Sequence, residues 1–135
     1  MPLTVLLDTN FVLIPGQFGI DIFAELSRIC DFPYKVAVLP QTMGELAAII
    51  GSRKASAKDR NAAKLGIQLL KVRQVGVISA ERKVFKSTDK AILQFAASGR
   101  KSVVVATQDR ALKSALKSAG VSVIVMRQKR HLVLE

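Results

Sequence analysis

The sequence predicts an α/β fold, a three-layer α/β/α sandwich in which helices cover both faces of a parallel sheet. Short apolar segments alternate with segments of helical periodicity, glycines end several of the helical segments, and Val103–Ala106 is apolar at every position. Alternating strands and helices imply right-handed βαβ crossovers. A strand that is apolar throughout is typical of a parallel sheet buried on both faces. The length of 135 residues favours a single domain, residues 1–135.

In the first half of the chain, an apolar run predicts a strand at Leu3–Leu7. Apolar residues at helical spacing then predict a helix from Phe18 to Cys30. A short apolar run ending before a proline predicts a strand at Val36–Leu39. Helical spacing resumes over Thr42–Ile50 and stops at a glycine.

The second half begins with a long basic segment, which predicts a helix over roughly Ser52 to Arg73. The same periodicity arguments place the later elements. The expected strands are Gly76–Ile78, Val103–Ala106 and Val121–Met126, and the expected helices are Ser87–Ala97 and Arg110–Ser118.

The charge is unevenly distributed along the chain. The net charge is +11 and the sequence pI about 10.3. Residues 1–50 carry two basic and five acidic residues, whereas residues 51–135 carry nineteen basic and five acidic residues. A basic surface attracts polyanions, and nucleic acid is the polyanion that a protein of this composition most often meets. A solubility function or an acidic protein partner is the alternative.

Composition also excludes several classes of protein. A single cysteine, Cys30, precludes an internal disulfide and fits a reducing compartment. No apolar run approaches the roughly 20 residues of a membrane span, and Asp8 and Asn10 interrupt the N-terminal apolar stretch that a signal peptide would need. We therefore expect a cytoplasmic protein with no membrane partner.

Four acids lie where strands end or where the following helices begin: Asp8, Glu45, Asp89 and Asp109. Taken singly, each has a structural explanation. Asp8 can stabilise a turn, Glu45 fits a capping box with Thr42, Asp89 suits a helix dipole, and Asp109 can cap a helix.

Taken together, these acids point to a metal site. The carboxyl ends of parallel strands converge on one edge of a sheet, where α/β proteins bind their ligands. Clustered carboxylates repel each other, and a divalent cation relieves the repulsion. Mg²⁺ and Mn²⁺ prefer carboxylate and water oxygens, whereas one cysteine and one histidine, His131, cannot form a zinc site of the usual kind. A carboxylate-held metal on a basic protein points to phosphodiester hydrolysis.

Four segments resemble the motifs of the PIN-domain nucleases, in the right order. They are LLDTN (Leu6–Asn10), LPQTMGEL (Leu39–Leu46), TDKAILQFA (Thr88–Ala96) and VVATQDRALK (Val104–Lys113). The stretch DTNFVLIPGQFGIDIFAEL is similar to archaeal, VapC-like relatives of the PIN proteins of small-subunit ribosomal RNA processing. The resemblance covers nearly the whole chain and implies a five-stranded parallel sheet and a Mg²⁺- or Mn²⁺-dependent endoribonuclease.

The resemblance also implies residue roles. Asp8, Glu45, Asp89 and Asp109 would bind the metal, Asn10 would brace Asp8 or hold a water, and Thr107 would line the site. Two departures bear on this assignment. Lys90 follows Asp89 where many relatives have a second acid, and no further acid follows Asp109 closely. Both put occupancy of a second metal in doubt.

Basic residues outside the motifs form two groups. If the basic helix begins as early as residue 53, one of its sides carries a ridge of cations: Arg53, Arg60, Lys64 and Lys71. A second group follows the last expected strand: Arg127, Lys129 and Arg130. We expect both to contact RNA phosphates, with a solvated face and a solvated tail as the alternatives. Aromatic residues are few, so base-stacking platforms are not evident.

Three other functions remain open from the sequence. The chain could be a toxin ribonuclease controlled by an antitoxin, or a non-catalytic RNA-binding factor that assembles on pre-ribosomal particles. Aspartyl-phosphate transfer on Asp8 is a third chemistry, but Asn10 stands where the phosphatases of that kind have an Asp. The resemblance further implies a homodimer.

Overall fold

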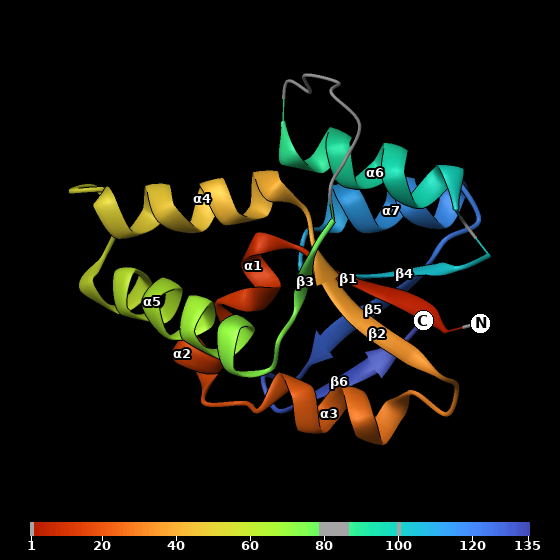
Figure 1. Cartoon of the computed structure of the whole chain (residues 1–135), viewed down its shortest axis with the longest axis horizontal. Helices are drawn as coiled ribbons and strands as arrows, with labels where there is room; N and C mark the ends of the chain where they lie inside the picture. Colours follow the sequence, from red (N-terminus) through yellow and green to blue (C-terminus); the bar gives the residue numbers. More distant parts are fainter. Residues whose placement is uncertain (1, 79–86, 100) are drawn as a thin grey trace.

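The computed structural model describes residues 2–78, 87–99 and 101–135. In this part of the chain, strands form one sheet in the order β3-β2-β1-β4-β5-β6 (Figure 1). The strands are β1 (Leu3–Leu7), β2 (Tyr34–Val38), β3 (Gly76–Val77), β4 (Val103–Ala106), β5 (Ser122–Arg127) and β6 (His131–Leu134). Strands β1 to β5 are parallel to their neighbours, and β6 is antiparallel to β5. The predicted parallel sheet is confirmed, with one further strand at its edge.

Helices cover both faces of the sheet (Figure 1). They are α1 (Thr9–Val12), α2 (Ile14–Phe18), α3 (Ile22–Ile29), α4 (Pro40–Gly51), α5 (Ala57–Val72), α6 (Thr88–Ser98) and α7 (Arg110–Ser118). Helices α1 to α5 share a buried apolar cluster with one face of the sheet, and α6 and α7 share a second cluster with the other face. The predicted three-layer arrangement is therefore confirmed. No helix in the described ranges combines the length and apolarity needed to cross a bilayer.

Strand β1 lies at the centre of the sheet and contributes to both apolar clusters. Val5 and Leu7 belong to the cluster under α1 to α5, and Leu6 belongs to the cluster under α6 and α7. Successive side chains of a strand point to opposite faces, so an uninterrupted apolar run is what a central strand of this sheet requires. The polar residue that ends the run, Asp8, consequently lies at the edge of the sheet.

The expected helix from Phe18 to Cys30 is wrong in its first part. The chain instead forms α2, which ends at Gly19 with a left-handed backbone (φ 68°), and then α3. The side chain of Asp21 begins α3 by accepting hydrogen bonds from the backbone N–H groups of Phe23 and Ala24. A left-handed glycine at a helix end followed by an N-capping Asp breaks the apolar periodicity that predicted one helix.

The basic helix also begins later than expected, at Ala57. Two serines account for the difference. Ser52 ends α4, and its hydroxyl accepts hydrogen bonds from the backbone N–H groups of Lys54 and Ala55. Ser56 then caps α5 by accepting a hydrogen bond from the N–H of Asp59. Arg53 therefore lies in the connection between the two helices and cannot belong to a ridge on α5.

The chain after β5 is not a tail. It turns at Gln128 and Lys129, which both have positive φ values (55° and 54°), and returns as β6, paired with β5 from Arg127↔His131 to Ile124↔Leu134. Positive φ at both central residues is the backbone that a tight hairpin turn needs to match the twist of its strands. Strand β6 thus covers the edge of the sheet next to β5.

Helix α5 crosses α1 and α2 at very short range, at two glycines. A Cβ added to Gly66 of α5 would lie 2.6 Å from Cγ1 and 2.9 Å from the carbonyl oxygen of Val12. A Cβ added to Gly16 of α2 would lie 2.4 Å from the Cα of Ala62. These crossings leave no room for a side chain, and they fix the position of α1, which begins directly after Asp8.

Candidate active site

The site lies where β1 and β4 end, side by side in the centre of the sheet. The register pairs Leu7 with Ala106, and the backbone N–H of Asp8 donates a hydrogen bond of 2.9 Å to the carbonyl of Ala106. The residues that follow these two strands, Asp8 and Thr107, are therefore brought together from distant parts of the sequence. This is the edge at which the sequence predicted a site.

Asp8 is buried, with 3% of its surface exposed, and both of its carboxylate oxygens accept hydrogen bonds. The Thr107 hydroxyl donates to Oδ2 over 2.7 Å, and the backbone N–H of Thr9 donates to Oδ1 over 2.8 Å. The Thr107 hydroxyl in turn accepts a hydrogen bond of 3.1 Å from the backbone N–H of Asp109. The carboxylate is thus held in one orientation by groups from both strand ends.

The surroundings of Asp8 disfavour its negative charge. Burial raises the pKa of Asp8 to about 6, against the effects of the Thr107 and Thr9 hydrogen bonds, and the negative charges of Asp89 and Glu45 raise it further. A carboxylate whose own neighbours resist its ionisation is one that a cation stabilises. The combination of burial and nearby acids therefore fits the expected chemistry of this edge.

We predict that the stability of the metal-free protein depends on pH through Asp8. The folded-state pKa of about 6 exceeds the ordinary value of 3.8, so the native state binds a proton that the unfolded state does not between these two values. The stabilising effect of protonation is complete below pH 4 and is lost as the pH rises through 6. Asp8→Asn, which carries no charge, is therefore expected to be more stable than the wild type by about 2 kcal/mol at pH 7.5.

Urea unfolding in EDTA at pH 7.5 and at pH 4 measures this difference. The advantage of Asp8→Asn should shrink to nearly zero at pH 4, where the wild-type carboxyl is protonated. A difference between the two proteins that stays constant over this range would contradict the assignment of the effect to the Asp8 charge.

Glu45 reaches the site through Thr9. It projects from the first half of α4, and its Oε1 accepts a hydrogen bond of 2.9 Å from the Thr9 hydroxyl. The capping-box explanation of Glu45 is wrong, because α4 begins at Pro40 after Leu39 and Thr42 lies inside the helix. Glu45 instead contacts Thr9, the residue that follows Asp8.

Asp89 and Asp109 begin helices on the other face of the sheet. Asp89 lies in the first turn of α6, which Ser87 caps. Asp109 caps α7, with its Oδ1 accepting a hydrogen bond of 2.8 Å from the N–H of Leu112. Partial burial, followed by the negative charges of Asp109 and Glu45, raises the pKa of Asp89. Asp89 and Asp109 therefore do stabilise helix starts, as the structural explanations predicted. The two acids nevertheless share an electrostatic environment with Glu45.

The donor chemistry suits a hard divalent cation, although the side chains do not converge on one point. Among residues 2–78, 87–99 and 101–135, no three acidic, histidine or cysteine side chains are grouped closely enough to hold a metal. In the same ranges, none of the four acids belongs to a salt bridge with a lysine or arginine. Mg²⁺ commonly takes only one or two protein carboxylates and keeps several waters. Asp8 with one or two neighbours fits that mode.

Asn10 does not contact Asp8 through any side-chain hydrogen bond in the described chain. Its Oδ1 accepts a hydrogen bond of 3.1 Å from the backbone N–H of Gln108, and its carbonyl accepts one of 2.8 Å from the Gln108 side chain. Asn10 and Gln108 thus tie the segment after β1 to the segment after β4. Sequence reasoning missed Gln108 and Thr9, although each lies between two residues that it did select.

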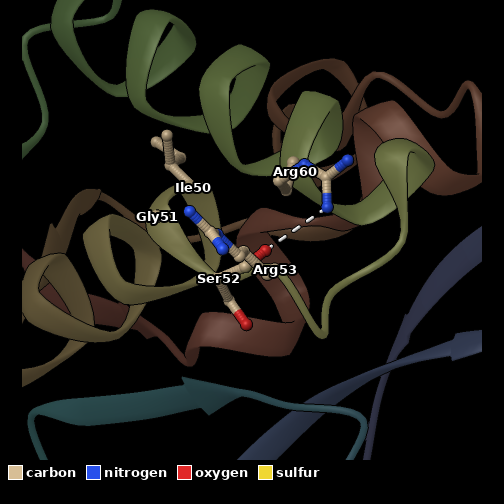
Figure 2. Close-up of a pocket in the computed structure, with 5 residues that line it drawn as sticks. All are labelled: Ile50, Gly51, Ser52, Arg53 and Arg60. Carbon is tan, nitrogen blue, oxygen red and sulfur yellow. Dashed lines mark hydrogen bonds between the residues drawn. The ribbon is translucent and has the colours of Figure 1, made fainter.

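The basic residues of α5 have different surroundings. Lys64 and Lys71 are exposed on the helix. The guanidinium of Arg60 instead donates hydrogen bonds to the carbonyls of Ser52, over 3.3 Å, and Ala55. Figure 2 shows Arg60 and Arg53 among the residues that line a pocket at the junction of α4 and α5. Arg60 therefore holds the connection between the helices, and part of its capacity for phosphate contact is already used.

The second basic group lies at the β5–β6 hairpin. Arg127 ends β5, and Lys129 and Arg130 lie in the turn. All three are exposed, and Arg127 pairs with Glu135, with 3.3 Å between Nη2 and Oε1. Strand β5 pairs with β4, and Arg127 lies at its carboxyl end, so Arg127 is near the same edge of the sheet as the candidate site.

Comparisons with known proteins agree with this fold. A family model described as a PIN like domain matches residues 5–129. Ribonuclease VapC4 of Methanocaldococcus jannaschii is 28% identical over 124 residues, which cover 92% of this chain and 90% of that protein. The structure of the PIN domain endonuclease Utp24 has the same fold, with a TM-score of 0.77, 20% sequence identity, and coverage of 99% of this chain and 92% of the other. Because the family model extends over most of its length, the chain belongs to the family of PIN-like domains.

Proposed function

We propose that this protein is a Mg²⁺- or Mn²⁺-dependent endoribonuclease that hydrolyses RNA phosphodiester bonds at the edge formed by β1 and β4. The observation that carries the proposal is the buried carboxylate of Asp8, which is held by Thr107 and Thr9 and faces the negative charges of Asp89 and Glu45. The similarity to a protein named as a ribonuclease supports the choice of RNA as substrate.

In this proposal Asp8 is the principal metal ligand, and Glu45, Asp89 and Asp109 complete the negative environment. A bound Mg²⁺ or Mn²⁺ would supply Lewis acidity for a phosphate oxygen and lower the pKa of a water. The Thr107 hydroxyl keeps the Asp8 carboxylate oriented, and Thr9 positions Glu45. Asn10 and Gln108 keep the two strand ends at a fixed separation, so the acids meet the substrate as a preorganised group.

The basic surface supplies affinity for the substrate. Lys64, Lys71, Lys129 and Arg130 are exposed cations suited to backbone phosphates, which give affinity without reading sequence. Arg53, Arg60 and Arg127 belong to the same proposed surface, but Arg60 and Arg127 already have partners within the protein. Contact with about five phosphates of single-stranded RNA would give a slope near −3.5 of log affinity against log salt.

A cleavage assay with and without a divalent metal tests the proposal. RNA should be cut with Mn²⁺ or Mg²⁺ and remain intact with EDTA, and Mn²⁺ should raise the midpoint of thermal unfolding at pH 7.5, where Asp8 is ionised. RNA binding without cleavage under all metal conditions would contradict the nuclease proposal and favour the RNA-binding assembly factor. A protein that neither binds nor cuts RNA would exclude both.

The more specific roles rest on the family resemblance. We propose a cytoplasmic protein of one domain that acts in ribosomal RNA processing, with a second copy of the chain and a pre-ribosomal particle as partners. A toxin ribonuclease with an antitoxin is the alternative, and growth arrest on expression distinguishes it. Light scattering of the purified protein measures the oligomeric state.

A further inference from the structure

A groove lies between the start of α7 and the end of β5. It has a volume of about 250 Å³ and is lined by Gln108, Arg110 and Lys113 on one side and by Met126, Arg127 and Glu135 on the other. Gln108 also bonds to Asn10 of the candidate site. Gln108 thus belongs both to the lining of the groove and to the link between the two strand ends, which places the groove next to the candidate site.

The groove is strongly cationic and contains one acid. The Glu135 carboxylate lies 3.1 Å from Nζ of Lys117 and 3.3 Å from Nη2 of Arg127 through Oε1, and 3.7 Å from Nζ of Lys113 through Oε2. These cations come from two elements, α7 and β5, and converge on a single negative charge. Arg110, which also lines the groove, is exposed and belongs to no salt bridge among the described residues.

Glu135 balances only part of the positive charge of these cations. Its Oε2 is buried and accepts no hydrogen bond from the described part of the chain, and the side chain carries one charge opposite three cations. The three cations lower the pKa of Glu135, the hydrogen bond from Lys117 most of all, so the side chain is an anion at neutral pH. A phosphodiester resembles this carboxylate, because it is also a singly charged anion with two free oxygens. In RNA it is joined to further phosphates, and Arg110 is available to contact one of them.

We propose that the groove between α7 and β5–β6 binds a backbone phosphate of the RNA beyond the cleavage site, and that Glu135 occupies its cations until the RNA displaces it. The inference rests on the proposed function, because it takes RNA as the substrate. Glu135 then weakens RNA binding in two ways: it competes for Lys113, Lys117 and Arg127, and it repels the incoming phosphate.

The test measures binding of a short fluorescent single-stranded RNA by anisotropy, in EDTA. Glu135→Gln keeps the shape and removes the charge, and it should tighten binding about three- to tenfold at 100 mM salt and steepen the salt slope by roughly 0.7 for each additional phosphate bound. Asp31→Asn is the matched control, because it makes the same change of charge at an exposed residue that does not line the groove. It should change the affinity by less than about twofold.

A second variant keeps the test independent of the stability of β6. Lys113→Gln removes a groove cation from α7, and it should weaken RNA binding and cancel most of the gain when combined with Glu135→Gln. Equal affinities of Glu135→Gln and Asp31→Asn, or weaker binding by Glu135→Gln with β6 intact by circular dichroism, would overturn the groove proposal. If the wild type still cuts RNA in Mn²⁺, the proposed function stands in that case; if the wild type neither binds nor cuts RNA, both proposals fall.

Discussion

Asp8→Asn should reduce RNA cleavage by about a thousandfold and leave RNA binding intact. In the proposed site, the substitution replaces a charged oxygen ligand by a neutral amide at the carboxylate that lies between the ends of β1 and β4. A metal contributes several kcal/mol of charge stabilisation in the transition state, and a loss of about 4 kcal/mol corresponds to a factor of about 10³ in rate. Because we expect this variant to be no less stable than the wild type at pH 7.5, the loss of activity should not come from unfolding.

The measurement is single-turnover cleavage of a labelled RNA in Mn²⁺, with binding measured separately in EDTA. Asp31→Asn serves again as the control, since it makes the same chemical change far from the site, and it should cut at the wild-type rate. Cleavage by Asp8→Asn at more than a tenth of the wild-type rate, in a preparation free of other ribonucleases, would disprove the role of Asp8.

Gly66→Ala should lower the free energy of unfolding by about 2–3 kcal/mol, the upper part of the range for overpacked cores. The added Cβ would lie 2.6 Å from Cγ1 and 2.9 Å from the carbonyl oxygen of Val12. The side-chain atom can move, but the carbonyl belongs to the backbone of α1. Helix α1 must therefore shift away from α5, and Asp8, which caps α1, must shift with it. Cleavage should fall together with stability.

Gly44→Ala is the control for this substitution. Gly44 lies inside α4, and a Cβ added there would meet nothing within 4 Å. Alanine is the better helix former, so this variant should gain about 0.5–1 kcal/mol. Urea unfolding compares the two variants with the wild type. If Gly66→Ala unfolds within about 0.5 kcal/mol of the wild type, the close crossing of α5 and α1 does not constrain the fold.

The parts of the fold that the sequence predicted correctly are those set by burial. Val103–Ala106 is buried at every position, and its composition alone indicates a central strand. The errors lie where a few polar atoms decide the backbone. Nothing in the charge pattern distinguishes Ser52 and Ser56 from other serines. Yet the Ser52 hydroxyl shapes the connection after α4, and the Ser56 hydroxyl caps α5.

In the candidate site, too, burial and strand order could be predicted from the sequence, whereas individual polar contacts could not. Parallel strands deliver their ends to one edge, so Asp8 and Asp109 could be placed near each other from the order of elements. The hydrogen bonds around these strand ends could not be predicted, because Thr107 and Gln108 bond to residues about a hundred positions away in the sequence. The groove at Glu135 was missed for a further reason: β6 pairs with β5, and this pairing brings Glu135 back beside Arg127.

The pairing of β1 with β4 has a consequence for biosynthesis. The hydrogen-bond donor of Asp8, Thr107, is translated 99 residues after it. At elongation rates of about 5–20 residues per second, that interval lasts roughly 5–20 seconds. During this time the nascent polypeptide carries Asp8 without the hydroxyl that orients it. In the proposed nuclease, a chain that ends before Thr107 is therefore expected to be inactive.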